Sequence, residues 1–325
     1  DGQTIFVAVG QSIQDAINAV PAGGTVVLSE GTYAISGEFG LVHGVGEFSI
    51  RGAVDGDGNP ATILDAEDSG RILSINFGQT SASVFENLVF TRGSRAGSGG
   101  ALGIGNGSSP LVRNCVFEAN HAGTLGGAVM ISASSPTFED CVFRSNDSTD
   151  GGAIFVTDGS SPTLVGCLIF GNLAENRGGG IYILESDGNF TDCDFEANVT
   201  TGDGSQGGAI YNDVCSPEFA DCRFVGNTAT FGSAMYNRVA SANLVGCIFF
   251  ANTGTEVTGA VHNYSESNGI FDSCIFEANL TAASEGGGVF NQTSNPTILD
   301  SRICSNIPDQ VSGVYTDLGG NCISE

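Results

Sequence analysis

The sequence contains no tryptophan and no lysine, and only 8 of its 325 residues are proline. All ten basic residues are arginine, against 36 aspartates and glutamates, which gives a formal net charge of −26. This excess of negative charge argues against binding to a nucleic-acid backbone or to an anionic membrane surface, because basic residues recognise both. No apolar run approaches the roughly 18 residues that span a bilayer. We therefore expect no nucleic-acid partner and no membrane insertion.

Helical patterns are scarce as well. The one segment with clear helix signals is SIQDAINAV (12–20), which places four apolar residues at helical spacing: Ile13, Ala16, Ile17 and Val20. Ser12 and Asp15 fit an N-terminal cap at its start. Glycine, by contrast, is abundant at 49 residues, about twice its usual share. This combination predicts many tight, regular turns, since glycine is not accompanied by the proline of a linker.

A repeat of about 26 residues dominates the sequence. SSPLVRNCVFEAN (108–120), SSPTFEDCVFRSN (134–146) and SSPTLVGCLIFGN (160–172) are three consecutive copies. The repeated cysteines are Cys115, Cys141, Cys167, Cys193, Cys222, Cys247 and Cys274. An asparagine follows five residues after each, and the full series is Asn120, Asn146, Asn172, Asn198, Asn227, Asn252, Asn279 and Asn306. A repeat of this kind must be interpreted before any local pattern, because it determines the fold.

Each unit contains two or three short alternating runs and no stretch long enough for a capped helix. One unit cannot bury its apolar face alone, so it must stack on its neighbours. The pattern predicts an all-β fold, a single parallel β-helix (solenoid) of about ten coils with an N-terminal capping helix. Cysteine would recur as a small buried residue, and asparagine as a ladder of turn amides. The leucine-rich frame is missing, and a propeller blade would be longer.

The ends of such a solenoid need covering, because they expose unpaired strand edges. We predict one domain over 1–325, with an N-terminal cap and first coil at 1–50, stacked coils at 51–306 and a C-terminal cap at 307–325. Cys304 and Cys322 fall outside the cysteine register. In an oxidising compartment they could form a capping disulfide, while the ladder cysteines should stay as packed thiols.

The segment SIQDAINAVPAGGTVVLSEGTYAI (12–35) resembles the N-terminal cap of the pectate-lyase-like right-handed parallel β-helix superfamily. The units between about 110 and 306, with CVFEAN and GGA, are similar to the repeats of bacterial secreted β-helix proteins and of chlamydial polymorphic outer-membrane proteins. The resemblance implies a right-handed β-helix. It does not select a function, because the superfamily holds lyases, hydrolases, epimerases, adhesins and spike proteins.

The strand after each GGA has a fixed inward position, and the residue next to it must therefore point outward. The inward residues are Val129, Ile154, Ile181, Ile210, Met235, Val261 and Val289. The outward residues form a predicted surface aromatic stripe of Met130, Phe155, Tyr182, Tyr211, Tyr236, His262 and Phe290. The stripe could stack on sugar rings, contact another subunit, or consist of neighbours that stabilise one another.

A second inward position, two residues after the first, changes from aliphatic residues to Asn212, Asn237, Asn263 and Asn291. The next outward position adds Asp213, Arg238 and Tyr264, which completes an outward patch with Tyr211, Tyr236 and His262. If the protein is an enzyme, His262, Arg238 and Tyr236 are the predicted catalytic residues of a polysaccharide lyase or epimerase that neutralises a uronate and moves a proton. The alternative is an ordinary Asp213–Arg238 charge pair beside surface aromatics.

No metal site is predicted, because the cysteines lie one per coil and no C-x-x-C pair occurs. AVDGDGNPA (53–61) resembles the first half of a calcium loop through Asp55, Asp57 and Asn59. Pro60 stands where glycine is needed, so we interpret the segment as a turn. We expect no cofactor, although calcium is possible.

The absence of a dominant acid/base cluster, and units of 25 to 29 residues without long inserted loops, favour a structural role over an enzyme. The first hypothesis is a secreted or cell-surface protein that self-associates into a fibre or layer, or acts as an adhesin. The alternatives are a polysaccharide lyase or epimerase and a non-catalytic carbohydrate-binding protein. The expected partner is the protein itself or a carbohydrate. The start at Asp1, without a methionine or a basic, apolar leader, is typical of a processed secreted chain or a trimmed one.

Overall fold

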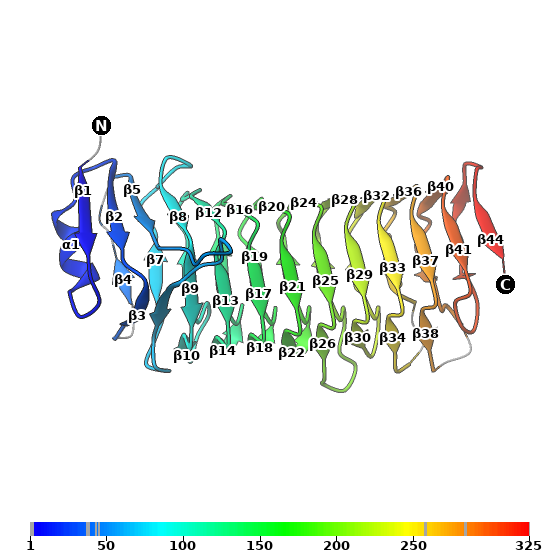
Figure 1. The fold of residues 1–325 in the computed structure, drawn as a ribbon. Coiled ribbons are helices and arrows are strands. Elements are labelled where there is room, and N and C mark those ends of the chain that lie inside the picture. The colour runs from blue at the N-terminus through cyan, green and yellow to red at the C-terminus, as the bar shows by residue number, and fades with distance from the viewer. Residues whose placement is uncertain are drawn as a thin grey trace.

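The computed structural model describes residues 3–36, 40–42, 44, 46–256, 259–282 and 285–324. The chain winds into a rod, with the two termini at opposite ends (Figure 1). Most coils contribute one strand to each of four sheets, which we number I to IV in order along one coil. The coil at 137–157 is representative and contains β16 (Thr137–Glu139), β17 (Val142–Arg144), β18 (Asp147–Asp150) and β19 (Ile154–Thr157).

Every pairing between named strands is parallel and joins equivalent residues of successive coils, as Phe117, Phe143 and Ile169 show in sheet II. In the described part of the chain, sheets I to IV contain 13, 12, 8 and 11 strands. Sheet I runs from β1 (Thr4–Val7) to β43 (Thr316–Asp317), and sheet II from β3 (Gly31–Ala34) to β44 (Cys322–Ser324). Sheet III runs from β10 (Ser94–Arg95) to β38 (Leu280–Thr281), and sheet IV from β4 (Leu41–Val42) to β42 (Val311–Ser312). The predicted all-β solenoid is confirmed, with about eleven coils rather than ten.

The core forms because alternate residues of each short strand point into the solenoid. In sheet II the inward position is phenylalanine on most coils, and rings on adjacent coils stack with centroids 4.5 to 4.8 Å apart. The predicted inward residues of sheet IV, from Val129 to Val289, are all fully buried. The periodic sequence therefore becomes a continuous apolar column along the rod.

The cysteine ladder occupies the corner between sheets I and II. Each of its seven thiols is at most 2% exposed and contacts a backbone carbonyl oxygen of the preceding coil at 3.5 to 3.6 Å. Burial raises the pKa of the Cys141 thiol well above its usual range. These cysteines are packed thiols, as the sequence predicts.

The asparagine ladder turns the chain from sheet II into sheet III. The amide of Asn172, for example, donates to the carbonyl oxygen of Phe143 and to Asn198 Oδ1, both at 2.9 Å. The ladder runs from Asn120 to Asn306, and the side chain of Gln310 closes it by accepting from the amide of Asn306 at 2.8 Å. Gln310 lies outside the repeat, and no feature of the repeat indicated this role.

The N-terminal end is covered by α1 (Ile13–Ala19), whose first turn is capped by Ser12 Oγ accepting from the Asp15 backbone N–H at 3.1 Å. The predicted capping helix is thus confirmed (Figure 1). Within the predicted cap segment 1–50, residues 1, 2, 37–39, 43 and 45 lie outside the described residues. The domain limits at 50 and 306 stay predictions.

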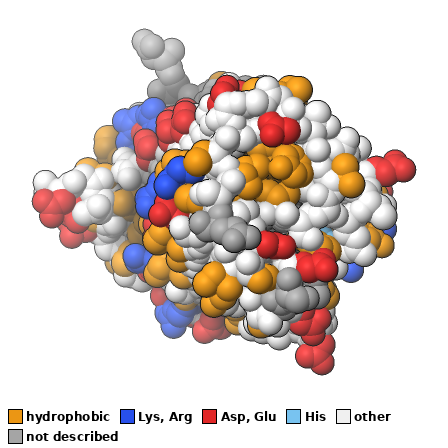
Figure 2. Space-filling model, turned by 90° about the vertical axis from the view of Figure 1, so that its right-hand side faces the viewer, with side chains coloured by type: hydrophobic (Ala, Val, Ile, Leu, Met, Phe, Trp, Pro, Cys, Tyr) orange, Lys and Arg blue, Asp and Glu red, His pale blue; other side chains and the backbone are white. Residues whose placement is uncertain are grey.

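The C-terminal end is less covered. Apolar side chains gather at the centre of this end face (Figure 2), and the last coil exposes Ile307, Val314 and Leu318 by 59%, 68% and 66%. Cys322 pairs in register with Arg302, while Cys304 pairs with Ser324, so the two cysteines are offset along neighbouring strands. Both are free thiols, so the predicted disulfide is not formed in this structure.

The segment 53–61 is a turn, as interpreted. Val54 and Pro60 form an antiparallel bridge, and Asp55 Oδ1 accepts hydrogen bonds from the backbone N–H groups of Asp57 and Asn59 at 2.9 Å. In the described ranges, no three His, Cys, Asp or Glu side chains are grouped to hold a metal ion. None of the described helices is both long enough and apolar enough to cross a membrane.

Candidate functional site

The predicted aromatic stripe lies on the outer face of sheet IV, one residue per coil. The strands that carry it are β15 (Val129–Ser132), β19, β23 (Ile181–Leu184), β27 (Ile210–Asp213), β31 (Met235–Arg238), β35 (Val261–Tyr264) and β39 (Val289–Gln292). The direction of its side chains is as predicted, but its exposure is not. Five members are only 2 to 5% exposed: Phe155, Tyr182, Tyr211, Tyr236 and His262. Met130 and Phe290 are partly buried.

The stripe is buried by its own members and by the ends of the sheet III strands. Phe155, Tyr182 and Tyr211 pack edge to face, with ring centroids 5.0 and 4.9 Å apart. Two residues pack against these rings from the side of sheet III. Leu125 is the last residue of β14 (His121–Leu125), and Phe231 lies in the segment that follows a later sheet III strand. The prediction of a surface stripe is therefore wrong in exposure, and the interpretation that neighbouring rings stabilise one another fits the structure. These rings present little face for stacking on a sugar.

The buried rings of the stripe form one line along sheet IV, which we call the aromatic column. Two ion pairs lie over its centre. Arg177, at the end of β22 (Leu173–Arg177), approaches Asp150 Oδ2 at 3.9 Å. Its guanidinium also lies 5.9 and 5.7 Å from the ring centres of Tyr182 and Tyr211. On the following coils, Arg238 donates to Asp213 Oδ1 at 2.7 Å, and the hydroxyl of Tyr182 donates to Asp213 Oδ2 at 3.4 Å. Two acids, two guanidiniums and a phenol thus form one polar cluster.

Burial changes the proton affinities of this cluster. Desolvation raises the pKa of the Asp150 carboxyl, although the charge of Arg177 opposes the shift. Asp150 Oδ1 is buried and accepts no hydrogen bond from the described residues. Desolvation and the charge of Asp213 also raise the pKa of Tyr182 and Tyr211 above the usual range, which keeps both phenols protonated. The cluster can therefore donate and accept hydrogen bonds.

His262 continues the column toward the C-terminal end. Its ring centre lies 4.6 Å from that of Tyr236 and 4.8 Å from that of Phe290. In the described part of the chain neither ring nitrogen has a hydrogen bond of good geometry, although Gln292 is close enough to affect the imidazole, and the residue is only 3% exposed. Burial lowers the pKa of the imidazole to about 4, and Gln292 opposes this shift only in part. The imidazole is therefore neutral near pH 7.

A surface hollow of about 580 Å³ begins beside His262. Its wall also contains Phe231, Glu285 and Gln292. The hollow gives this end of the face a polar recess next to the buried imidazole.

The predicted outward patch is assembled in part as expected. Tyr211 and Tyr236 stack with centroids 5.4 Å apart, and Tyr236 contacts both His262 and Tyr264. Of the predicted catalytic residues, Tyr236 and His262 are in contact and buried, whereas Arg238 is engaged by Asp213. The predicted charge pair is confirmed, and a catalytic role for the three residues stays a prediction.

Asp150, Arg177 and Phe231 were missed in the sequence because they do not belong to the regular strands after GGA. All three lie between a ladder asparagine and the following small-residue pair, in the most variable part of the unit. These variable segments bring different side chains to the edge of sheet IV on each coil. Their variability beside a constant ladder was the signal available in the sequence.

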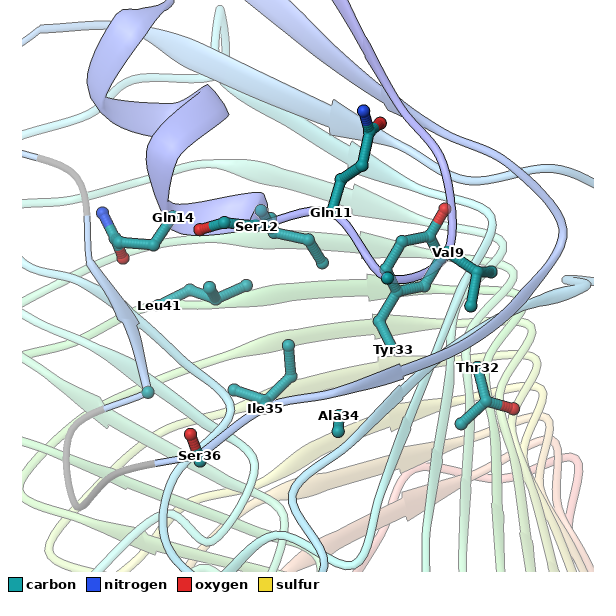
Figure 3. Close-up of a pocket in the computed structure, with 13 residues that line it drawn as sticks. Val9, Gln11, Ser12, Gln14, Thr32, Tyr33, Ala34, Ile35, Ser36 and Leu41 are labelled. Carbon is teal, nitrogen blue, oxygen red and sulfur yellow. The ribbon is translucent and has the colours of Figure 1, made fainter.

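A further hollow of about 560 Å³ lies between the cap helix and the first coil (Figure 3). Gln11, Gln14, Tyr33 and Leu41 are among the side chains around it. The Tyr33 hydroxyl is already bonded to the carbonyl oxygens of Val7 and Ser29. Because none of its described lining residues carries a formal charge, the hollow lacks the chemistry of the sheet IV face.

Residues 62–195 match the family model described as "Right handed beta helix region". A comparison with curated proteins finds no match. Pectate lyase Pel9A superimposes with a TM-score of 0.53 at 12% identity, covering 99% of this chain and 78% of that one. The catalytic domain of the GH87 α-1,3-glucanase, solved with tetrasaccharides, gives 0.53 at 14% identity and covers 99% and 68%. The surface adhesin PfbA of Streptococcus pneumoniae gives 0.47 at 10% identity and covers 98% of both.

The chain is a right-handed parallel β-helix, as its resemblance to the pectate-lyase-like superfamily implied. At these identities the similar structures establish the fold alone. The function must therefore be argued from the residues of this chain.

Proposed function

We propose that this protein binds an extended glycan outside the cell, along the outer face of sheet IV. The observation that carries the proposal is the polar cluster of Asp150, Arg177, Tyr182, Asp213 and Arg238 above the buried aromatic column. Its donors and acceptors are spread over successive coils at a spacing of about 4.8 Å. A linear sugar chain offers hydroxyl groups at a comparable interval.

The proposal relies on hydrogen bonds rather than on ring stacking, because the aromatic column is only slightly exposed. The groups available to a ligand are the guanidiniums of Arg177 and Arg238, whose side chains are 45% and 47% exposed. A guanidinium presents several N–H donors in a fixed geometry, so both groups can donate hydrogen bonds to sugar oxygens. The fold is compatible with this role, since the α-1,3-glucanase domain of similar fold was solved with tetrasaccharides.

The test is a comparison of Arg177→Gln with wild type in glycan-array binding followed by isothermal titration calorimetry. We expect the variant to bind the retained glycan at least about tenfold more weakly, because it removes the guanidinium that connects Asp150 with two tyrosine rings. Arg223→Gln is the matched control. Its side chain is 50% exposed against 45% for Arg177, but it lies on sheet II and pairs with Asp194.

Failure of every glycan to bind, or equal binding by Arg177→Gln and wild type, would contradict the proposal. New absorbance from unsaturated uronate ends would instead favour the lyase alternative. In that case, loss of turnover in His262→Gln would identify His262 as a residue of the lyase site.

Self-association is a second candidate, and it is supported by apolar residues on other faces of the rod. Sheet I exposes Val245 and Ile270 by 49% and 43%, and sheet II exposes Phe170 and Phe250 by 42% and 43%. Val245 and Ile270 border a shallow hollow of about 410 Å³. Val245 and Ile270 lie on adjacent strands, and exposed apolar residues that gather in this way are typical of contact surfaces.

If these residues mediate assembly, Phe250→Ser should raise the dissociation constant at least about tenfold, because it removes an exposed aromatic anchor. Light scattering and negative-stain electron microscopy measure the effect. Phe77→Ser is the control, since Phe77 is similarly exposed at 46% but follows a sheet IV strand near the other end. Isolated rods for the wild type at all concentrations would refute this second function.

A further inference from the structure

Arg71 occupies an unusual place on the outer face of sheet IV. It precedes β7 (Leu73–Ile75), and its guanidinium lies over Gly103 in the neighbouring strand, β11 (Leu102–Ile104). A Cβ atom at position 103 would stand 2.1 Å from Arg71 Nη1, so only glycine leaves room for the guanidinium. Gly103 lies directly next to Met130 in register, so the guanidinium extends the line of the aromatic column toward the N-terminal end.

The guanidinium is held in place by backbone carbonyl oxygens. Arg71 Nε donates to Gly99 O at 2.9 Å, and Nη2 donates to Ser98 O. Among the residues that the structure describes, Nη1 has no hydrogen-bond partner, and Arg71 as a whole is only 9% exposed. The side chain is therefore fixed with one donor group unused.

Arg71 also lacks the counter-charge that most arginines of this protein have. Eight of the ten arginines pair with a carboxylate within 4.0 Å in the described part of the chain, and Arg71 is not among them. Burial and the charge of Arg95 lower the pKa of Arg71 to about 10, so it stays a cation at neutral pH. A buried cation without an anion is costly, and an anionic ligand would remove that cost.

A hollow of about 410 Å³ adjoins the guanidinium. Its described lining is Val42, Arg71, Ser74, Asn76, Phe77, Arg95 and Asn106, which includes two cations, two amides and a hydroxyl, but no acid. In a protein of net charge −26, this local excess of donors is the opposite of the general surface. Guanidinium groups match the planar geometry of carboxylates and also bind sulfate and phosphate oxygens.

We propose that the hollow beside Arg71 binds an oxyanion carried by the glycan, either a uronate carboxylate or a sulfate ester. The inference rests on the proposed function, because the hollow lies on the same face of sheet IV as the polar cluster. Arg71 would meet the anion through Nη1, and Arg95 would add a second positive charge. The amides and the hydroxyl would fix the orientation of the sugar.

The experiment titrates wild type and variants with a galacturonate oligosaccharide, its neutral methyl ester and an O-sulfated neutral oligosaccharide. Arg71→Gln should weaken binding of the charged probe at least about tenfold while leaving the methyl ester unchanged. Gly103→Ala should have a similar effect without a change of charge, because the new Cβ displaces the guanidinium. Arg223→Gln again serves as the control. The charged probe with the higher wild-type affinity identifies which oxyanion is recognised.

A folding control and a second variant complete the experiment. Circular dichroism establishes whether each variant is folded. Arg95→Gln, at the partly exposed rim, removes the second positive charge and should weaken binding of the charged probe less than Arg71→Gln does. Equal affinity of wild type for charged and neutral probes would overturn this inference while the proposed function stands. Binding of free sulfate that depends on Arg71, with no glycan bound at all, would support the anion site and refute the proposed function.

Discussion

Replacing Asn172 by alanine should lower the free energy of unfolding by about 3–5 kcal/mol, a large effect for one side chain. The side chain of Asn172 takes part in four hydrogen bonds, all buried: its amide donates to Phe143 O and Asn198 Oδ1, and its Oδ1 accepts from the backbone N–H and the amide of Asn146. The substitution leaves the backbone N–H and one of the two amide N–H groups of Asn146 without a partner, while the other amide N–H still donates to Phe117 O. Each buried donor left unsatisfied costs about 1–3 kcal/mol.

Urea unfolding followed by circular dichroism measures this loss, and hydrogen exchange at the Asn146 backbone N–H locates it. The second readout is needed because stacked coils contact only their neighbours and can open locally. Asn189→Ala is the control. Asn189 is the exposed first residue of β24 (Asn189–Thr191), and we expect a change of at most about 0.5 kcal/mol there. Equal stability of the two variants would show that the ladder is not a main source of stability.

The variant His262→Phe should be more stable than wild type, and its advantage should grow as the pH falls. In the folded state burial lowers the pKa of His262 to about 4, whereas the unfolded chain has an imidazole pKa near 6.5. Between these values the unfolded state binds more protons, so wild-type stability decreases as pH drops from about 6.5 to 4. The loss amounts to about 3 kcal/mol at the acidic end.

Phenylalanine removes this penalty because it does not titrate. It also removes two buried nitrogens without partners and continues the ring contacts with Tyr236 and Phe290. The gain measured by urea unfolding should be about 2–3 kcal/mol larger at pH 4.5 than at pH 8. Asp150 titrates in both proteins, so its contribution cancels in the comparison.

A gain independent of pH would mean that the pKa of His262 is the same in the folded and the unfolded protein, contrary to the burial of its imidazole. His121→Phe provides the control for a general effect of removing an imidazole. The His121 side chain is 50% exposed and contacts Asp147 at 2.7 Å. His121→Phe should not be more stable than wild type, because stabilisation is expected only where a buried imidazole is removed.

The fold could be predicted from the sequence because its determinants repeat. Cys141 and Asn146 each recur once per unit, and a residue that recurs at a fixed interval must occupy the same place on every coil. The inward direction of Ile154 followed from the alternation of side chains along a strand. The capping helix was predictable from Ser12 and the apolar spacing that follows it.

The candidate site was only partly predictable, since alternation gives the direction of a side chain but not what covers it. Tyr182 and Tyr211 point outward as expected, yet Arg177 and neighbouring rings bury them. Arg71 reaches its place over Gly103 from outside any strand, so no periodicity indicates it. The parts of the site that repeat were found, and the parts supplied by single coils were not.

The equal length of successive units has an evolutionary consequence. Cys115, Cys141, Cys167 and Cys193 are separated by the same 26 residues, and each coil pairs in register with the next. A gene segment encoding one such unit can therefore be duplicated or lost without shifting a ladder or opening the interior. Each event would add or remove one variable segment at the edge of sheet IV. Binding specificity could then diversify by unequal recombination while the scaffold remains intact.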